Sequence, residues 1–328
     1  QREFYLFYLR QGAAFLSIAA SDPELLSDVD PERVAKARKA GHLALKEYQD
    51  RLMSNKNAWS VVAVPNQAWA EKVFPAANGP EAREKLWQAI IRAVRADAAD
   101  PVAAWEQHIQ VLNRRLAFLN AGKFARLHYT NSLGTDLYIE LPANHVWQGG
   151  ADHTPAGVEF IANLPTEEVY TLPAKTGVNG KVVSSRPLNY NGNLIKDFAF
   201  TFKAGQIVEV TAAQGREVLR KLIATDEGAR YLGEVALVPD DSPISNSGLL
   251  FYNTLFDENA ACHLAIGQAY PGCLAEGETL TPAGLEQAGA NSSLVHVDFM
   301  IGTPDLAITG LTAAGTETAV FRNGNFAI

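Results

Sequence analysis

The sequence predicts an α+β protein, with a helix-rich α/β part first and a mostly antiparallel β part after it. Up to about residue 122 the apolar residues recur at three- and four-residue steps, as in amphipathic helices. Beyond that point they alternate with polar residues, as in half-buried strands. At roughly 100–200 residues per domain, a chain of 328 residues holds two cores. We therefore expect a helix-rich α/β domain over residues 1–122 and a β-rich domain over residues 123–328.

Four elements are predicted in the first part. A helix starts after Asp30, a residue type that caps helix starts, and runs over 31–53. The apolar run 59–64 predicts a buried strand that ends at a proline. Two further helices are expected over 80–95 and 101–122, the second closed by a glycine.

The second part is predicted from alternation and turn chemistry. Residues 125–129 and 137–141 alternate on either side of a turn, and 198–202 and 207–210 flank a short loop that contains glycine, so two hairpins are expected. One helix over 215–224 interrupts the strands. No internal repeat or low-complexity tract is found.

Composition excludes several classes of protein. Hydrophobic residues are 47% and charged residues 20%, as in ordinary globular proteins. The net charge of −8 argues against nucleic acid or a membrane surface as the main partner. No apolar run is long enough to cross a bilayer, and no secretory signal is visible. Two cysteines form no disulfide framework, so a cytoplasmic location is expected.

His296 and Asp298 lie two apart in the apolar run 295–301. In a strand such residues point to the same face. Buried side by side, they must pair with each other or bind a metal, because unpaired burial is costly. The spacing alone leaves both interpretations open. The other five histidines, among them His108 in a predicted amphipathic helix, are interpreted as structural or as residues beside a loop.

Glu258 and His263 are five apart in a segment that we expect to be helical. An ideal helix separates such positions by about 140°, so they can share an ion only if Glu258 lies at the helix start. Capping residues followed by an ordinary helix histidine are the favoured alternative. Tyr270, two turns beyond His263, would lie near the same face.

Three carboxylates stand in apolar surroundings. Glu167 and Glu168 end an apolar run. Adjacent residues of an extended segment point to opposite sides, so one of the two can bind a metal while the other faces a substrate. Adjacent acidic residues are, however, more often simply exposed to solvent. Glu234 lies within a predicted buried strand, where a carboxylate is costly unless compensated.

Together these segments predict a site for two divalent ions, because carboxylates and imidazoles bind such ions and leave them Lewis-acidic. Zinc, cobalt, manganese and magnesium all suit this ligand set. The candidate metal ligands are Glu168, Glu234, Glu258, His263, His296 and Asp298.

The same segments resemble the M29 metallo-aminopeptidases, the family of the thermophilic aminopeptidases T and S. The resemblance runs from about Asp22 to the end of the chain. It is carried by Asn163-Leu-Pro-Thr-Glu-Glu-Val169, Leu232-Gly-Glu-Val-Ala-Leu237, Asp257-Glu-Asn-Ala260, His263-Leu-Ala-Ile-Gly267 and His296-Val-Asp-Phe-Met-Ile-Gly302, with Gly134-Thr-Asp-Leu137 and Trp147. It implies that the six candidate ligands bind two metals, that Glu234 bridges them, and that Tyr270 is a catalytic-site tyrosine.

The resemblance implies an aminopeptidase that releases N-terminal residues from short peptides through a water activated by two metals. Glu167 is the expected general base, by analogy with adjacent Glu pairs in other dinuclear aminopeptidases, and Tyr270 is expected to donate to the oxyanion. A homodimer is also implied. Family members usually begin with a further α/β stretch, so this chain is expected to start partway through that domain. The alternatives are another dinuclear hydrolase of esters, amides or phosphoesters, and a non-catalytic binding protein stabilised by metal.

Overall fold

The computed structural model describes residues 2–26, 28–190 and 192–328, and the chain divides into two compact units. Each unit is assembled from segments that are far apart in the sequence. Unit 1 comprises Gln1–Trp105, Ala151–Thr166 and Leu250–Leu255, and unit 2 comprises Glu106–Gly150, Glu167–Leu249 and Phe256–Ile328. The expected domain division at residue 122 stays a prediction. Within the described ranges, no helix combines the length and the apolarity needed to cross a membrane.

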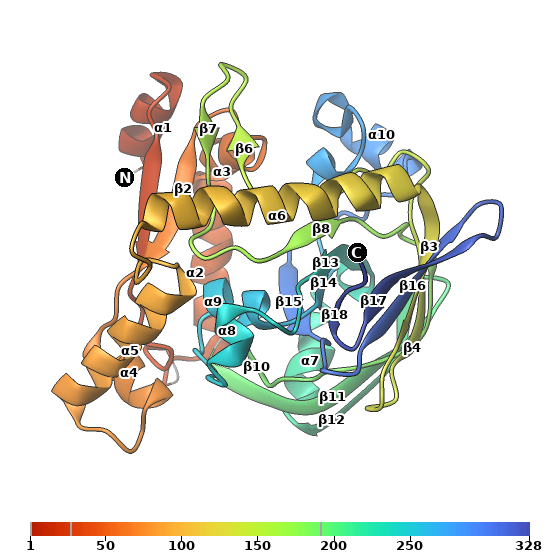
Figure 1. The fold of residues 1–328 in the computed structure, drawn as a ribbon. Coiled ribbons are helices and arrows are strands. Elements are labelled where there is room, and N and C mark those ends of the chain that lie inside the picture. The colour runs from red at the N-terminus through yellow and green to blue at the C-terminus, as the bar shows by residue number, and fades with distance from the viewer. Residues whose placement is uncertain (1, 27, 191) are drawn as a thin grey trace. The chain divides into compact units, whose positions relative to one another are not determined.

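Unit 1 has α/β character, because its helices accompany a parallel pair of strands (Figure 1). Phe15 of β1 lies opposite Trp59 of β2. The elements are α1 (Arg2–Arg10), β1 (Phe15–Ala19), α2 (Pro31–Ala44), α3 (Lys46–Met53), β2 (Trp59–Ala63), α4 (Gln67–Val73), α5 (Gly79–Ala93), β6 (Asp152–His153) and β7 (Glu159–Phe160). Helices α6 (Pro101–Gly122) and α9 (Thr254–Asp257) begin in unit 1 and end in unit 2.

The predicted helices at 80–95 and 101–122 are confirmed as α5 and α6. Asn78 caps α5 by accepting a bond from the Glu81 N–H at 3.3 Å, and Asp100 caps α6 by accepting from the Ala103 N–H at 3.0 Å. The strand predicted at 59–64 is confirmed as β2, but most of it is half-buried rather than buried.

The single helix predicted over 31–53 is wrong, because Leu45 leaves the helical conformation (φ −108°, ψ 15°) and separates α2 from α3. Tertiary packing explains the break. The Tyr48 ring of α3 lies 5.0 Å from the ring of Tyr5 and 5.1 Å from that of Phe15. The periodicity of alanine carries no information on such contacts.

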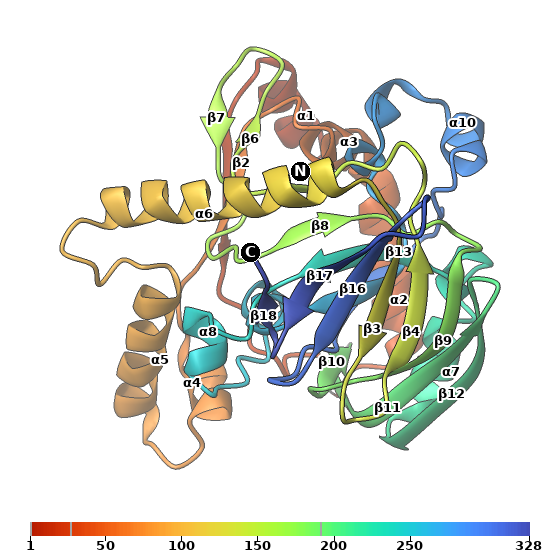
Figure 2. The same cartoon turned by 45° about the vertical axis from the view of Figure 1, so that its right-hand side comes forward.

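Unit 2 is dominated by antiparallel sheets, as predicted. Within the described residues one sheet has nine strands, in the order β10-β11-β9-β4-β3-β16-β17-β18 with β12 beside β11, and another has five, in the order β15-β14-β13-β8-β5. Figure 2 shows β3, β4, β16 and β17 side by side. The strands are β3 (Phe124–Thr130), β4 (Asp136–Glu140), β5 (Gln148–Gly149), β8 (Val169–Thr171), β9 (Val178–Val183), β10 (Leu188–Tyr190), β11 (Asn193–Lys203), β12 (Gln206–Gln214), β13 (Leu232–Leu237), β14 (His263–Gly267), β15 (His296–Met300), β16 (Ala307–Thr312), β17 (Glu317–Arg322) and β18 (Asn325–Phe326).

Both predicted hairpins and the predicted helix of this part are confirmed. Strands β3 and β4 form the first hairpin, and β11 and β12 form the second, closed where Lys203 lies opposite Gln206. The helices of unit 2 are α7 (Arg216–Leu222), η1 (Gly228–Arg230), α8 (Pro243–Asn246), η2 (Glu258–Ala260), η3 (Pro271–Cys273), η4 (Gly277–Thr279) and α10 (Pro282–Gln287).

The core of unit 2 lies between its two large sheets. The Phe299 ring of the five-stranded sheet packs 5.2 Å from Phe200 and 5.9 Å from Phe198 of the nine-stranded sheet. Side chains alternate along a strand, so the neighbours of these core residues project from the other side of the five-stranded sheet. We call that side, which carries Glu234, His263 and Asp298, the outer face.

The helix expected after Glu258 is wrong beyond its first turn. Residues Glu258–Ala260 form the short helix η2, but His263–Gly267 is the fully buried strand β14, paired on both sides. A short apolar run is compatible with a buried helix or a central strand, and its neighbours in the sheet decide between them.

Candidate metal centre

The register of three strands gathers the predicted ligands on the outer face. Glu234 of β13 lies opposite Ala265 of β14, which lies opposite Asp298 of β15. One small side chain therefore separates the two carboxylates. His296 lies opposite Gly267, whose φ of +107° and whose close approach to the Val295 carbonyl both require glycine. The residues between and opposite the predicted ligands on this face are therefore small.

Glu234 is the centre of the cluster, because its two oxygens face different imidazoles. Oε1 lies 3.7 Å from His263 Nε2, and Oε2 lies 3.2 Å from His296 Nε2. The Glu234 side chain is buried, on a strand that is buried throughout. The predicted buried strand and the predicted compensation of its carboxylate are both present.

Each imidazole also contacts a second carboxylate besides that of Glu234. Glu168, just before β8, places Oε2 3.1 Å from His263 Nε2. Asp298 places Oδ1 3.3 Å from His296 Nε2, as the spacing of two in a strand predicts. The ligand atoms thus form two sets of three, Glu168–Glu234–His263 and Glu234–His296–Asp298, each within 4.8 Å, and Glu234 belongs to both.

The imidazoles are oriented for metal binding. His296 Nδ1 lies 2.7 Å from the Gln268 carbonyl oxygen, and His263 Nδ1 lies 3.2 Å from that of Ala261. A carbonyl oxygen only accepts, so each Nδ1 carries a proton, and Nε2 is the ring nitrogen that faces the carboxylates. Metal-ligating histidines are held in this way. The donor set of the outer face therefore fits divalent cations.

Electrostatics also favour a cation here. Burial lowers the pKa of His263, but its bonds to Glu168 and Glu234 outweigh burial and hold that pKa well above the usual range. Burial lowers the pKa of His296 as well, and Asp298 and Glu234 raise it well above normal. A proton on each imidazole offsets part of the carboxylate charge, and divalent ions bound to these residues would take the place of those protons.

Glu258 lies beside the two sets without belonging to either. Burial, followed by the charges of Glu168 and Asp298, raises the pKa of Glu258 well above its usual value. Its carboxyl Oε1 accepts a bond from Asn259 Nδ2 at 3.5 Å. The helix start expected for Glu258 is the short helix η2, and His263 is reached through the strand that follows.

Tyr270 reaches the cluster by a different path from the one expected. Because β14 is a strand, Tyr270 comes from the turn after it, not from two helical turns beyond His263. Its hydroxyl lies 3.4 Å from His296 Nε2, and its ring lies 4.8 Å from the His296 ring. Burial, then Glu234 and Asp298, raise the pKa of Tyr270 well above normal, so it stays protonated.

Glu167 contacts two groups that lie outside these two sets. Its Oε2 lies 3.6 Å from Nε2 of His108 on α6, and its N–H donates to Asn259 Oδ1 at 2.7 Å. Sequence reasoning missed His108 and Asn259. A helix histidine carries no sign of its partner, and Asn259 resembles any capping residue. Tyr170 follows Glu168 by two, and its ring lies 5.9 Å from that of Tyr270.

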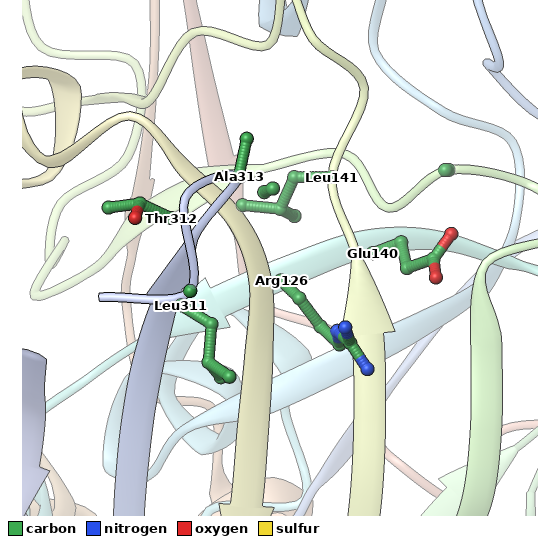
Figure 3. Close-up of a pocket in the computed structure, with 9 residues that line it drawn as sticks. Arg126, Glu140, Leu141, Leu311, Thr312 and Ala313 are labelled. Carbon is green, nitrogen blue, oxygen red and sulfur yellow. The ribbon is translucent and has the colours of Figure 1, made fainter. Parts of the chain in front are cut away.

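A surface pocket of about 350 Å³ lies elsewhere in unit 2, at the ends of β3, β4 and β16 (Figure 3). Arg126, Glu140 and Thr312 are among its lining residues. None of the predicted site residues lines it, so it does not contribute to the metal centre.

Comparison with known proteins agrees with this chemistry. The model of the thermophilic metalloprotease family M29 matches residues 1–326. The chain is 53% identical over 317 residues to aminopeptidase 2 of Geobacillus stearothermophilus, covering 97% of this chain and 76% of that protein. It is 46% identical over 319 residues to aminopeptidase T of Thermus thermophilus, covering 97% and 78%. The solved structure of wild-type AmpT from Thermus thermophilus matches with a TM-score of 0.93 at 44% identity, over 100% of this chain and 79% of that one. The chain belongs to the M29 family of thermophilic metalloproteases.

Proposed function

We propose that the chain is an aminopeptidase that uses two divalent ions to release the N-terminal residue of short peptides. The observation that carries this proposal is the shared carboxylate of Glu234, whose two oxygens face the two imidazoles. The aminopeptidase names of its M29 relatives support peptide hydrolysis over ester or phosphoester hydrolysis and over a non-catalytic role.

Two ligand sets are proposed for the ions. Glu168, Glu234 and His263 would hold one, Glu234, His296 and Asp298 the other, and Glu258 would add a further carboxylate. Bound divalent ions act as Lewis acids that polarise a carbonyl and lower the pKa of water. Zinc, cobalt, manganese and magnesium all suit these ligands.

The remaining groups of the site handle protons and charge. A carboxylate oxygen of Glu167 accepts the proton of the attacking water and passes it to the leaving amine. The Tyr270 hydroxyl, kept protonated by its raised pKa, donates to the oxygen that becomes negative in the transition state. The acidic surroundings favour the free ammonium group of a peptide N-terminus over a blocked one. A cytoplasmic location and a homodimer belong to the same proposal.

The proposal is tested by amino-acid release from dipeptides and aminoacyl p-nitroanilides. EDTA should abolish release, and zinc, cobalt, manganese or magnesium added singly should restore it. N-acetylated peptides are the matched control, because they lack the free amine. Equal cleavage of free and acetylated peptides, or activity that survives metal removal, would refute the proposal.

The role of Glu167 is tested separately. Glu167→Gln removes the proton acceptor and keeps the volume, so kcat should fall by about two to four orders of magnitude while metal content is unchanged. Undiminished kcat in this variant would remove Glu167 from the mechanism.

A further inference from the structure

The side chain of Glu167 meets a buried imidazole on helix α6. His108 Nε2 lies 3.6 Å from Glu167 Oε2, and the two residues are 7% and 2% exposed. The views of Figures 1 and 2 both place α6 next to β8, the strand that follows Glu168. A buried carboxylate requires compensation, and the His108 imidazole supplies it from an element that holds none of the proposed metal ligands.

The backbone of Glu167 is held as well. Arg115, two helical turns after His108 on α6, donates from Nη1 to the Glu167 carbonyl oxygen at 3.5 Å. Asn259 Oδ1 accepts from the Glu167 N–H at 2.7 Å. Side chain, carbonyl and N–H of Glu167 therefore each have a partner, and two of the three partners come from one helix.

We propose that His108 is a positioning residue, which keeps the Glu167 carboxylate in the orientation needed for proton transfer. The inference rests on the proposed function, in which Glu167 is the general base. A proton acceptor works only within hydrogen-bond reach of the proton it takes. Displacement by about 1 Å costs on the order of 10²-fold in rate. Truncation of His108 removes the partner on one side and lets the carboxylate turn.

The test measures kcat, KM and metal content in two His108 variants. His108→Ala should lower kcat about 10- to 100-fold, the usual effect of losing a group that orients a reacting residue, with KM and bound metal near wild type. His108→Gln keeps an N–H donor and should recover part of kcat, and it replaces the alanine variant if that one fails to fold. His128→Ala is the matched control, because it removes an imidazole 2.7 Å from Asp136, a pair that lies outside the site. Wild-type kcat in His108→Ala would overturn the proposal, as would equal losses in both His108 variants.

A double variant separates positioning from general structural damage. If His108 acts through Glu167, adding His108→Ala to Glu167→Gln should lower kcat no further, because the group that it orients is already gone. Independent, multiplying losses would overturn the proposal. A fully active Glu167→Gln would also overturn it while leaving the peptidase function intact. A wild-type chain that releases no amino acid would refute the proposed function itself.

Discussion

Replacement of Glu234 by glutamine should remove both bound ions, whereas replacement of Glu168 should remove one. Glu234→Gln keeps the volume of the side chain and removes its charge. Glu234 belongs to both ligand sets, so each set loses one of its three side chains. Glu168→Gln weakens only the set that contains His263, and Glu234, His296 and Asp298 remain.

The expected loss of kcat follows from the membership of Glu234 in both ligand sets. Ions that polarise a carbonyl supply several kcal/mol of transition-state stabilisation, and a loss of about 4 kcal/mol lowers kcat about 10³-fold. Glu234→Gln should therefore hold close to no metal and lose about 10³-fold or more in kcat. Glu168→Gln should retain about one ion per chain.

The assay combines metal analysis by mass spectrometry after dialysis with hydrolysis of leucine p-nitroanilide. Glu140→Gln is the control, because it makes the same change at an exposed position of β4 in the same unit. Two ions per chain in Glu234→Gln would refute the shared ligand. Equal metal content in the Glu168 and Glu234 variants would contradict the assignment of two sets.

Three further predictions concern single residues. Tyr270→Phe keeps the ring but loses the hydroxyl near His296, so kcat should fall about 10²- to 10³-fold with metal content unchanged, and wild-type kcat would exclude the oxyanion role. Gly267→Ala puts a methyl group against the Val295 carbonyl at φ +107°, so it should lower the free energy of unfolding, measured in urea, by about 1–3 kcal/mol. Gly315→Ala is the control, because Gly315 also has a positive φ but has open space around it, and the loss at Gly267 should be the larger of the two. Bonds from Thr303 and Ser132 lower the pKa of Asp305 from 3.8 to about 2, so its ionised form stabilises the fold above pH 3.8 and this contribution is lost as the pH falls towards 2. Asp305→Asn should therefore lower the Tm at pH 6, and the difference from wild type should shrink near pH 2; a difference independent of pH would refute this.

Much of the fold was predictable because its signals are local. The signals that bound these elements lie within a few residues of them in the sequence. Examples are the caps at Asn78 and Asp100 and the glycine-containing turns between alternating segments. The break at Leu45 and the strand after Glu258 were not predictable in this way. Both depend on packing partners distant in the sequence, which composition and periodicity do not report.

The site, too, has features that follow from local sequence and features that depend on residues distant in the sequence. His296 and Asp298 share a strand, so their common face follows from a spacing of two. The contacts of Glu234 with both imidazoles depend on the register between strands, and a shift by one residue would turn Glu234 into the core. The resemblance to a family supplied the set of candidate ligands before the register between the strands was known. His108 and Asn259 could not be predicted as part of the site, because only their contacts with Glu167 distinguish them from other histidines and asparagines.

The distribution of ligands along the chain has a consequence for biosynthesis. From Glu168 to Asp298 about 130 positions must emerge from the ribosome before both ligand sets exist, and three strands must then align. If these residues hold the ions as proposed, a nascent or half-assembled chain would lack complete ligand sets, and tight metal binding would wait for the strands to align. Bound metal would then indicate that the five-stranded sheet has formed with its strands in register.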